Sequence, residues 1–242
     1  MKKILKSILP NGAINFLKAI NDNLNVLIGN ISFQFTKVKN DFEVLEFRTI
    51  DISDEYNEKW QFWSRIFEYP IIIKTIKRLK SEHKIQNELI HNTCWGFEDI
   101  HKKFKEKLEF DFHRIVNSDI LQSNELNTMV YDITKPSPDN MLNKYDFVIN
   151  VSSIEEIFNN HYKTFRNLFD MVKEGGFLIM TFDLPGLQLD KFEKVFNKKM
   201  ETTKNPINGI NSPINDTRYA GLQVGFLVIK KINQQNSKSI FK

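Results

Sequence analysis

Short apolar runs alternate with helical patterns from residue 87 onward, and this alternation constrains the fold more than any other feature of the chain. Strands are predicted at 88–94, 112–120, 127–133, 145–153, 175–183 and 221–231. Helical spacing of apolar residues predicts helices at 96–108, 153–173 and 190–200. Such alternation predicts an α/β fold, with a mostly parallel sheet covered by helices on both faces and ligands bound beyond the carboxyl ends of the strands.

The first turn of this pattern lies in the stretch "ELIHNTCWGFEDIHKKF", where a strand, a single glycine and a helix follow one another. A strand, a tight turn and a helix N-terminus form the usual cradle for a phosphate or a nucleotide. Such cradles normally carry two or three glycines, whereas this one has only Gly96. The sequence therefore leaves open whether the turn holds a nucleotide-like ligand.

Composition excludes several classes of protein. The 242 residues, 41% of them hydrophobic, are enough to bury a substantial core. The net charge of +4 comes from 34 basic and 30 acidic residues that are interleaved, so a nucleic-acid partner is not expected. The one cysteine, Cys94, excludes an internal disulfide and a multi-cysteine zinc site; no metal site and a cytoplasmic location are predicted.

Residues 1–85 are predicted to be an N-terminal extension of a domain at 86–232, and 233–242 a disordered tail. In the extension, 1–20 is an amphipathic helix, 31–50 a hairpin, and two helices that cap the sheet meet at Pro70. The first helix either packs on the domain or makes a weak peripheral contact with an anionic membrane. No signal peptide and no membrane span is expected.

Two stretches of the second half resemble class I S-adenosylmethionine-dependent methyltransferases. "YDFVINVSSIEEIFNNHYKTFRNLFDMVKEGGFLIMTFD" has an Asp-led strand, a Ser-x-x-Glu turn, a long helix and a Gly-Gly turn into the next strand. "MVYDITKPSPDNMLNKYDFV" is similar to the family's third-strand stretch, and "FWSRIFEYPIII" looks like some bacterial members. The resemblance covers 60–231 and implies a Rossmann-like methyltransferase fold with S-adenosylmethionine as cofactor.

The resemblance also implies a set of cofactor-binding residues. They are Asn92, Cys94 and Gly96 in the first motif, Asp119 for the ribose, Asp132 and Ile133 beside the adenine, and Asn150 and Val151 facing the methyl donor. Only Gly96 matches the glycines of the first motif, and Glu98 replaces one of the others. Asp119 has a turn or N-cap aspartate as its alternative role, and Asp132 an Asx turn.

Methyl transfer to a hydroxyl often uses a base that takes the proton. Asp183, at the end of the predicted strand 175–183, and His161 are the candidates, with turn and packing roles as their alternatives. Glu156 stands three residues after Ser153 and is better explained as part of a helix cap than as a base.

These features predict an S-adenosylmethionine-dependent O-methyltransferase that acts on a small-molecule or sugar hydroxyl. The resemblance to bacterial members places it in surface polysaccharide biosynthesis, of capsule or lipooligosaccharide. The alternative is a catalytically inactive methyltransferase-like partner protein, because the first motif is degenerate. P-loop, HExxH and GxSxG patterns are absent from the sequence, and a dinucleotide oxidoreductase is disfavoured because GxGxxG is absent too.

Overall fold

The central element is a seven-stranded sheet in the order β1-β7-β6-β5-β2-β3-β4. The computed structural model describes residues 41–54, 57, 60, 64–94, 96, 99–121, 128–157, 161–184, 186–208 and 221–233. The strands are β1 (Phe42–Thr49), β2 (Leu89–Thr93), β3 (Arg114–Asp119), β4 (Thr128–Val130), β5 (Tyr145–Val151), β6 (Val172–Leu184) and β7 (Gln223–Lys231). Five neighbouring strands, β4, β3, β2, β5 and β6, are parallel, and β7 is antiparallel to both β6 and β1.

The order of the parallel strands makes this a doubly wound sheet. Counted from β2, the chain first builds outward to β3 and β4, then returns to the other side of β2 with β5 and β6. The order reverses between β2 and β5, and in open α/β sheets ligands bind at this switch point, beyond the carboxyl ends of the strands. The predicted Rossmann-like α/β fold class is therefore confirmed.

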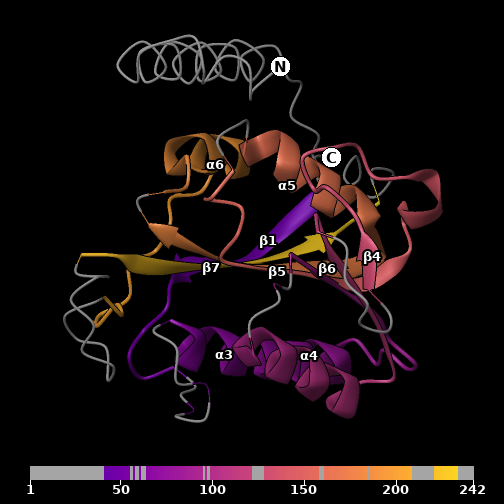
Figure 1. Ribbon diagram of the computed structural model, residues 1–242. Helices are drawn as coiled ribbons and strands as arrows, with labels where there is room; N and C mark the ends of the chain where they lie inside the picture. The colour runs from indigo at the N-terminus through magenta and orange to yellow at the C-terminus, as the bar shows by residue number, and fades with distance from the viewer. Residues whose placement is uncertain are drawn as a thin grey trace, which may run out of the picture.

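Helices cover both faces of the sheet (Figure 1). Helices α3 (Arg65–Glu82) and α4 (Asp99–Asp111) lie on one face, and α5 (His161–Met171) and α6 (Leu189–Phe196) on the other. A short 3-10 helix, η2 (Asp139–Met141), precedes β5. Each face has its own apolar core: one contains Ile72 and Ile149, the other Phe165 and Val148. Because β5 is buried on both sides, all seven of its residues are buried, as is typical of a central parallel strand.

Helix α3 passes through Pro70, so the prediction of two helices meeting there is wrong. Proline has no N–H to donate to the carbonyl four residues earlier, which here belongs to Ile66. The backbone N–H of Asn57 donates to that carbonyl at 3.0 Å instead. A partner from outside the helix therefore satisfies the group that proline would have left unpaired.

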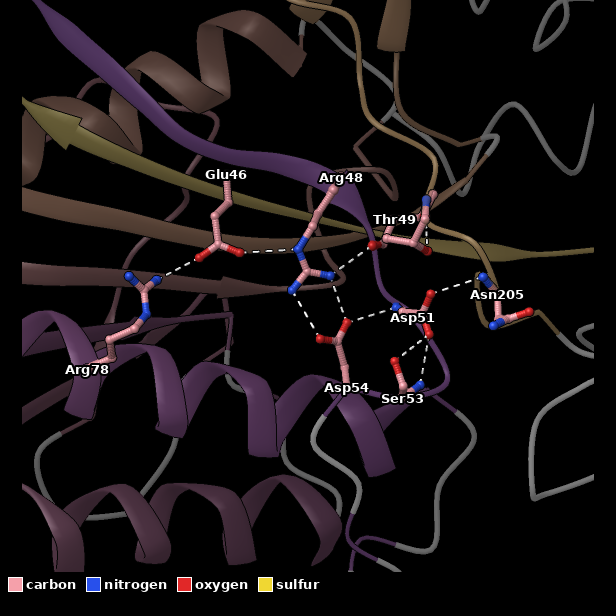
Figure 2. A network of polar contacts seen from close by, with 9 residues as sticks. Glu46, Arg48, Thr49, Asp51, Ser53, Asp54, Arg78 and Asn205 are labelled. Atoms are coloured by element: carbon pink, nitrogen blue, oxygen red, sulfur yellow. Dashed lines mark hydrogen bonds and ion pairs between the residues drawn. The ribbon is translucent and has the colours of Figure 1, made fainter.

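Strand β1 lies at the edge of the sheet, although it falls within the predicted extension. It pairs with β7, while the first half of the predicted hairpin lies outside the described residues. Arg48 of β1 contacts Asp54 at 2.7 Å and Glu46 at 3.2 Å, and Arg78 of α3 contacts Glu46 at 2.6 Å (Figure 2). This chain of ion pairs ties the edge strand to the helix beneath it. The domain division at residue 86 stays a prediction.

A later segment pairs with the carboxyl end of β1 at the free edge of the sheet. The N–H of Thr49 donates to the carbonyl of Glu201, and the N–H of Glu201 donates to Phe47, both at 2.9 Å. Asn205 donates its N–H to the carboxylate of Asp51 at 3.0 Å (Figure 2). Residues 201–207 therefore protect an edge that would otherwise present unpaired backbone groups.

Several predicted boundaries moved. Helix α5 begins at His161 rather than at 153, and Ser153 and Glu156 lie in the turn before it, so the predicted helix cap there is wrong. Strand β6 begins at Val172, directly after α5. The predicted helix at 1–20 and the tail from 234 lie outside the described residues. Within the described ranges, each helix is too short or too polar to cross a membrane.

Candidate functional site

A small cavity lies at the switch point of the sheet. It is enclosed by the carboxyl ends of β2 and β5 on one side and by α3 and α4 on the other. Its lining residues are Arg65, Tyr69, Asn92, Cys94, His101, Phe104, Val151 and Ser152. The cavity volume of about 110 Å³ is below the roughly 300 Å³ of the smallest common ligand pockets. It therefore has room for one end of a ligand rather than for a whole nucleoside.

The turn after β2 uses its single glycine for a close contact within the protein. Gly96 has a φ of +71°, and a Cβ at this position would lie 2.7 Å from Cδ2 of His101. The His101 ring is held there by a 2.5 Å hydrogen bond between its Nδ1 and the hydroxyl of Tyr69. The ring of Tyr69 in turn stacks on the ring of Phe104, with the ring centroids 3.9 Å apart. The space that glycine usually leaves for a ligand is occupied by a histidine.

Asp119 closes the same turn from the end of β3. Its Oδ2 accepts the N–H of Gly96 at 3.2 Å, and its Oδ1 accepts the N–H of Leu121 at 3.1 Å. These bonds confirm the alternative role of a turn aspartate. Each carboxylate oxygen can accept a further bond, so Asp119 retains the capacity to bind the two hydroxyls of a ribose.

The predicted residues on β2 and β5 are buried at the switch point. Asn92 donates from Nδ2 to Oδ1 of Asn117 at 3.0 Å. Asn150 donates from Nδ2 to the hydroxyl of Thr93 at 3.0 Å, and its Oδ1 has no partner among the described residues. Burial raises the pKa of the Cys94 thiol to about 12, so this group is not an activated nucleophile.

Asp132 and Ile133 are absent from the cavity lining. Oδ1 of Asp132 accepts the N–H of Thr134 at 2.9 Å and its hydroxyl at 2.6 Å, which is an Asx turn. These bonds lower the pKa of Asp132. Ile133 is 4% exposed within the core on the α5 face. The turn role of Asp132 is confirmed, and the adenine contact stays a prediction for both residues.

A buried ion pair that the sequence analysis missed lies beside the cavity. Glu68 of α3 is fully buried, and its carboxylate accepts the Ser64 hydroxyl at 2.6 Å, the Ser152 hydroxyl, and Nη1 of Arg65. Burial opposes ionisation of Glu68, but Arg65 and the two serines outweigh it and its pKa is lowered. The polar residues within the otherwise apolar stretch "FWSRIFEYP" were the available signal.

Two further carboxyl groups lie at the ends of β5 and β6. Burial, together with the charge of Glu68, raises the pKa of Asp183 to about 7. Burial and the nearby Asp183 raise the pKa of Glu155 to about 8. One oxygen of each, Oδ1 of Asp183 and Oε2 of Glu155, is buried without a hydrogen-bond partner among the described residues. Asp183 therefore combines a free acceptor with a proton affinity suited to exchange near neutral pH.

His161 has both ring nitrogens engaged by backbone groups. Its Nε2 donates to the carbonyl of Ile157 at 2.8 Å, and its Nδ1 accepts the N–H of Gln188 at 3.1 Å. Burial is the main cause of its lowered pKa. These bonds explain the residue as a connection between two turns, so we carry forward only Asp183 as a candidate base.

Comparison with known proteins gives matches to solved structures. One is an S-adenosylmethionine-dependent methyltransferase from Clostridium acetobutylicum ATCC 824, with 10% identity, 66% of this chain and 91% of that chain covered, and a TM-score of 0.47. Another is the CurJ carbon methyltransferase, with 13% identity, 69% of this chain and 55% of that chain covered, and a TM-score of 0.47. A third is the [4+2]-cyclase SpnF, with 10% identity, 88% of this chain and 94% of that chain covered, and a TM-score of 0.43.

The match to CurJ spans about half of that chain, at 55%. No protein-family model and no curated protein sequence matches. The fold class rests on the strand order, and a fold class does not by itself imply an activity.

Proposed function

We propose that this chain is an S-adenosylmethionine-dependent methyltransferase that acts on a hydroxyl of a small molecule or sugar. The observation that carries the proposal is Asp183, whose pKa is raised to about 7 at the carboxyl end of β6 and whose Oδ1 has no partner among the described residues. A carboxylate of this kind can accept the proton that a hydroxyl loses.

The residues around the switch point fit the cofactor at two places. Asp119 has acceptor capacity left for the ribose hydroxyls, and Arg65 has a buried N–H donor without a partner among the described residues. The glycine turn does not fit in the arrangement described, because His101 occupies it. Bound S-adenosylmethionine would supply a methyl group on a positively charged sulfur.

The protein itself would bind and orient the acceptor and remove the proton from its hydroxyl. Oδ1 of Asp183 would accept a hydrogen bond from the acceptor hydroxyl and take its proton as the oxygen becomes bonded to carbon. Glu155, with its pKa raised to about 8, is largely protonated at neutral pH and adds little negative charge beside Asp183. A surface polysaccharide precursor as acceptor is supported by the sequence resemblance of 62–73 to bacterial members of the group.

The experiment measures transfer of labelled methyl groups from S-adenosylmethionine to a panel of sugars and nucleotide sugars. We expect Asp183→Asn to lower the transfer rate by at least 100-fold, the size of a typical general-base contribution, while binding of S-adenosylhomocysteine is retained. Asp190→Asn, at an exposed position in α6, is the matched control. Equal transfer by wild type and Asp183→Asn would refute the assigned base.

A second candidate function is a methyltransferase-like partner protein that binds no cofactor. The His101 ring in the glycine turn favours it, because a ligand must displace that ring to approach the backbone. Calorimetric titration with S-adenosylhomocysteine separates the two functions. Stoichiometric binding supports the enzyme, whereas no binding at millimolar ligand would leave the partner protein as the better account.

A further inference from the structure

Arg65 carries a donor that the protein leaves unused. Its side chain is 12% exposed, and Nη1 bonds Glu68 and, at 3.3 Å, the hydroxyl of Ser64. Its Nε is buried and has no partner among the described residues. Because leaving a buried N–H unpaired destabilises a protein, an acceptor brought by a ligand would be favourable there.

The position of Arg65 indicates what that acceptor is. Arg65 lines the switch-point cavity together with Asn92 and Ser152, which stand at the ends of β2 and β5. A cavity of about 110 Å³ accommodates a carboxylate-sized group. The planar fork of a guanidinium matches the two oxygens of a carboxylate better than any other side chain does.

The turn after β2 is not available for the same group. The N–H of Gly96 already donates to Asp119 at 3.2 Å, and the His101 ring fills the space over the glycine. The anionic end of a ligand is therefore directed toward α3.

We propose that Arg65 binds the carboxylate at the amino-acid end of S-adenosylmethionine, in place of the glycine turn. The inference rests on the proposed function, because it concerns the seating of that cofactor. It assigns to α3, which precedes the first parallel strand, a ligand contact that the turn after β2 does not make. Asp119, which bonds the turn at Gly96 and does not line the cavity, is kept as the proposed contact for the ribose.

The test compares two ligands that differ only at the end in question. S-adenosylhomocysteine carries the amino-acid group, whereas 5′-methylthioadenosine has the same nucleoside and no carboxylate. By calorimetry, we expect wild type to bind S-adenosylhomocysteine at least ~10-fold more tightly, or by about 1.4 kcal/mol, because the carboxylate adds a charge-assisted hydrogen bond. Arg65→Met should lose this advantage and keep its affinity for methylthioadenosine within about twofold.

Two controls separate binding from folding. Arg65→Met leaves Glu68 buried and unpaired, so the double variant Arg65→Met/Glu68→Gln removes that charge as well, and thermal unfolding reports whether each variant is folded. Arg78→Met removes an arginine from an exposed position in the same helix, where it pairs with Glu46 and Glu82, and should change neither affinity.

Each outcome decides the question. If folded Arg65→Met/Glu68→Gln keeps the preference for S-adenosylhomocysteine, or loses affinity for both ligands equally, Arg65 does not bind the carboxylate. If wild type binds both ligands equally well, the inference fails while the proposed function stands. If wild type binds neither, the proposed function fails and takes the inference with it.

Discussion

Replacing Asp183 with asparagine should make the free energy of unfolding fall less steeply as pH rises. The pKa of Asp183 is raised to about 7 in the folded protein, from an ordinary value of 3.8, chiefly by burial and then by the charge of Glu68. A carboxyl group whose folded pKa is raised contributes stability that is complete below the unfolded pKa and is lost as pH rises through the folded pKa. Between these two values the carboxyl is protonated in the folded protein and ionised in the unfolded chain, so stability falls as pH rises across this range.

The magnitude follows from the linkage. One pKa unit corresponds to about 1.4 kcal/mol, so full ionisation of Asp183 destabilises the fold by on the order of 4 kcal/mol. Part of this is already lost at about pH 5, because the unfolded carboxyl is ionised there. Between about pH 5 and about pH 8, wild type should lose roughly 2–3 kcal/mol through this group. Asparagine resembles the protonated carboxyl and does not titrate, so the variant should not lose that amount.

Urea unfolding at several pH values measures the effect as a free energy of unfolding. We expect the wild-type curve to fall more steeply toward pH 8 than the curve of Asp183→Asn, with Asp190→Asn following wild type. Parallel curves for wild type and Asp183→Asn over this range would show that the pKa of Asp183 in the folded protein is not raised toward 7. The argument for Asp183 as a base would then be lost.

Three further changes test single contacts within the fold. Gly96→Ala should destabilise the protein by about 1–3 kcal/mol, because φ is +71° and the new Cβ would lie 2.7 Å from His101; thermal unfolding of the double variant with His101→Ala shows how much is steric. Gly225→Ala should lower the unfolding free energy by about 3 kcal/mol or more, since its Cβ would lie 2.0 Å from the Phe182 ring across the β6–β7 pair; an unchanged melting temperature would contradict this. Glu88→Gln should remove stability at neutral pH, because the fully buried Glu88 has a lowered pKa: burial opposes ionisation, but the bonds from Lys80, from the backbone N–H of His113 and from the His113 ring together outweigh it. That stability is present above the unfolded pKa and is lost as pH falls through the folded one, so the two unfolding curves should converge in acid.

The alternation of apolar runs was sufficient to predict the parallel sheet, because a strand such as β5, buried on both faces, is apolar throughout. It was not sufficient for β1. A strand with Glu43, Glu46 and Arg48 among its residues looks like part of an exposed hairpin, and only its pairing with β7 brings it into the sheet. Local patterns do not specify which distant strand an edge strand will join.

Two predicted helix boundaries are wrong, although the local sequence pattern favoured each of them. Pro70 indicates a helix end, yet α3 continues because the N–H of Asn57 reaches the carbonyl of Ile66 at 3.0 Å. Ser153 and Glu156 have the spacing of a helix cap, yet the helix begins at His161. At Pro70 the sequence rule describes the local preference correctly, and a contact from outside the helix outweighs it. At Ser153 the spacing of a cap is present, but no helix follows it directly.

Part of the candidate site could be predicted from the residue types that follow the strands. Asp119 is the last residue of β3 and bonds the turn at Gly96, which is the turn role given as its alternative in the sequence analysis. The role of Gly96 could not be read from its neighbours, because the ring that fills its space belongs to His101 and is held in place by Tyr69 from another helix. A single glycine in a nucleotide-like turn therefore has two physical explanations, room for a ligand and room for a side chain. In this turn the side chain of His101 occupies the space over Gly96, and for that reason we propose that Arg65 binds the anionic end of the ligand.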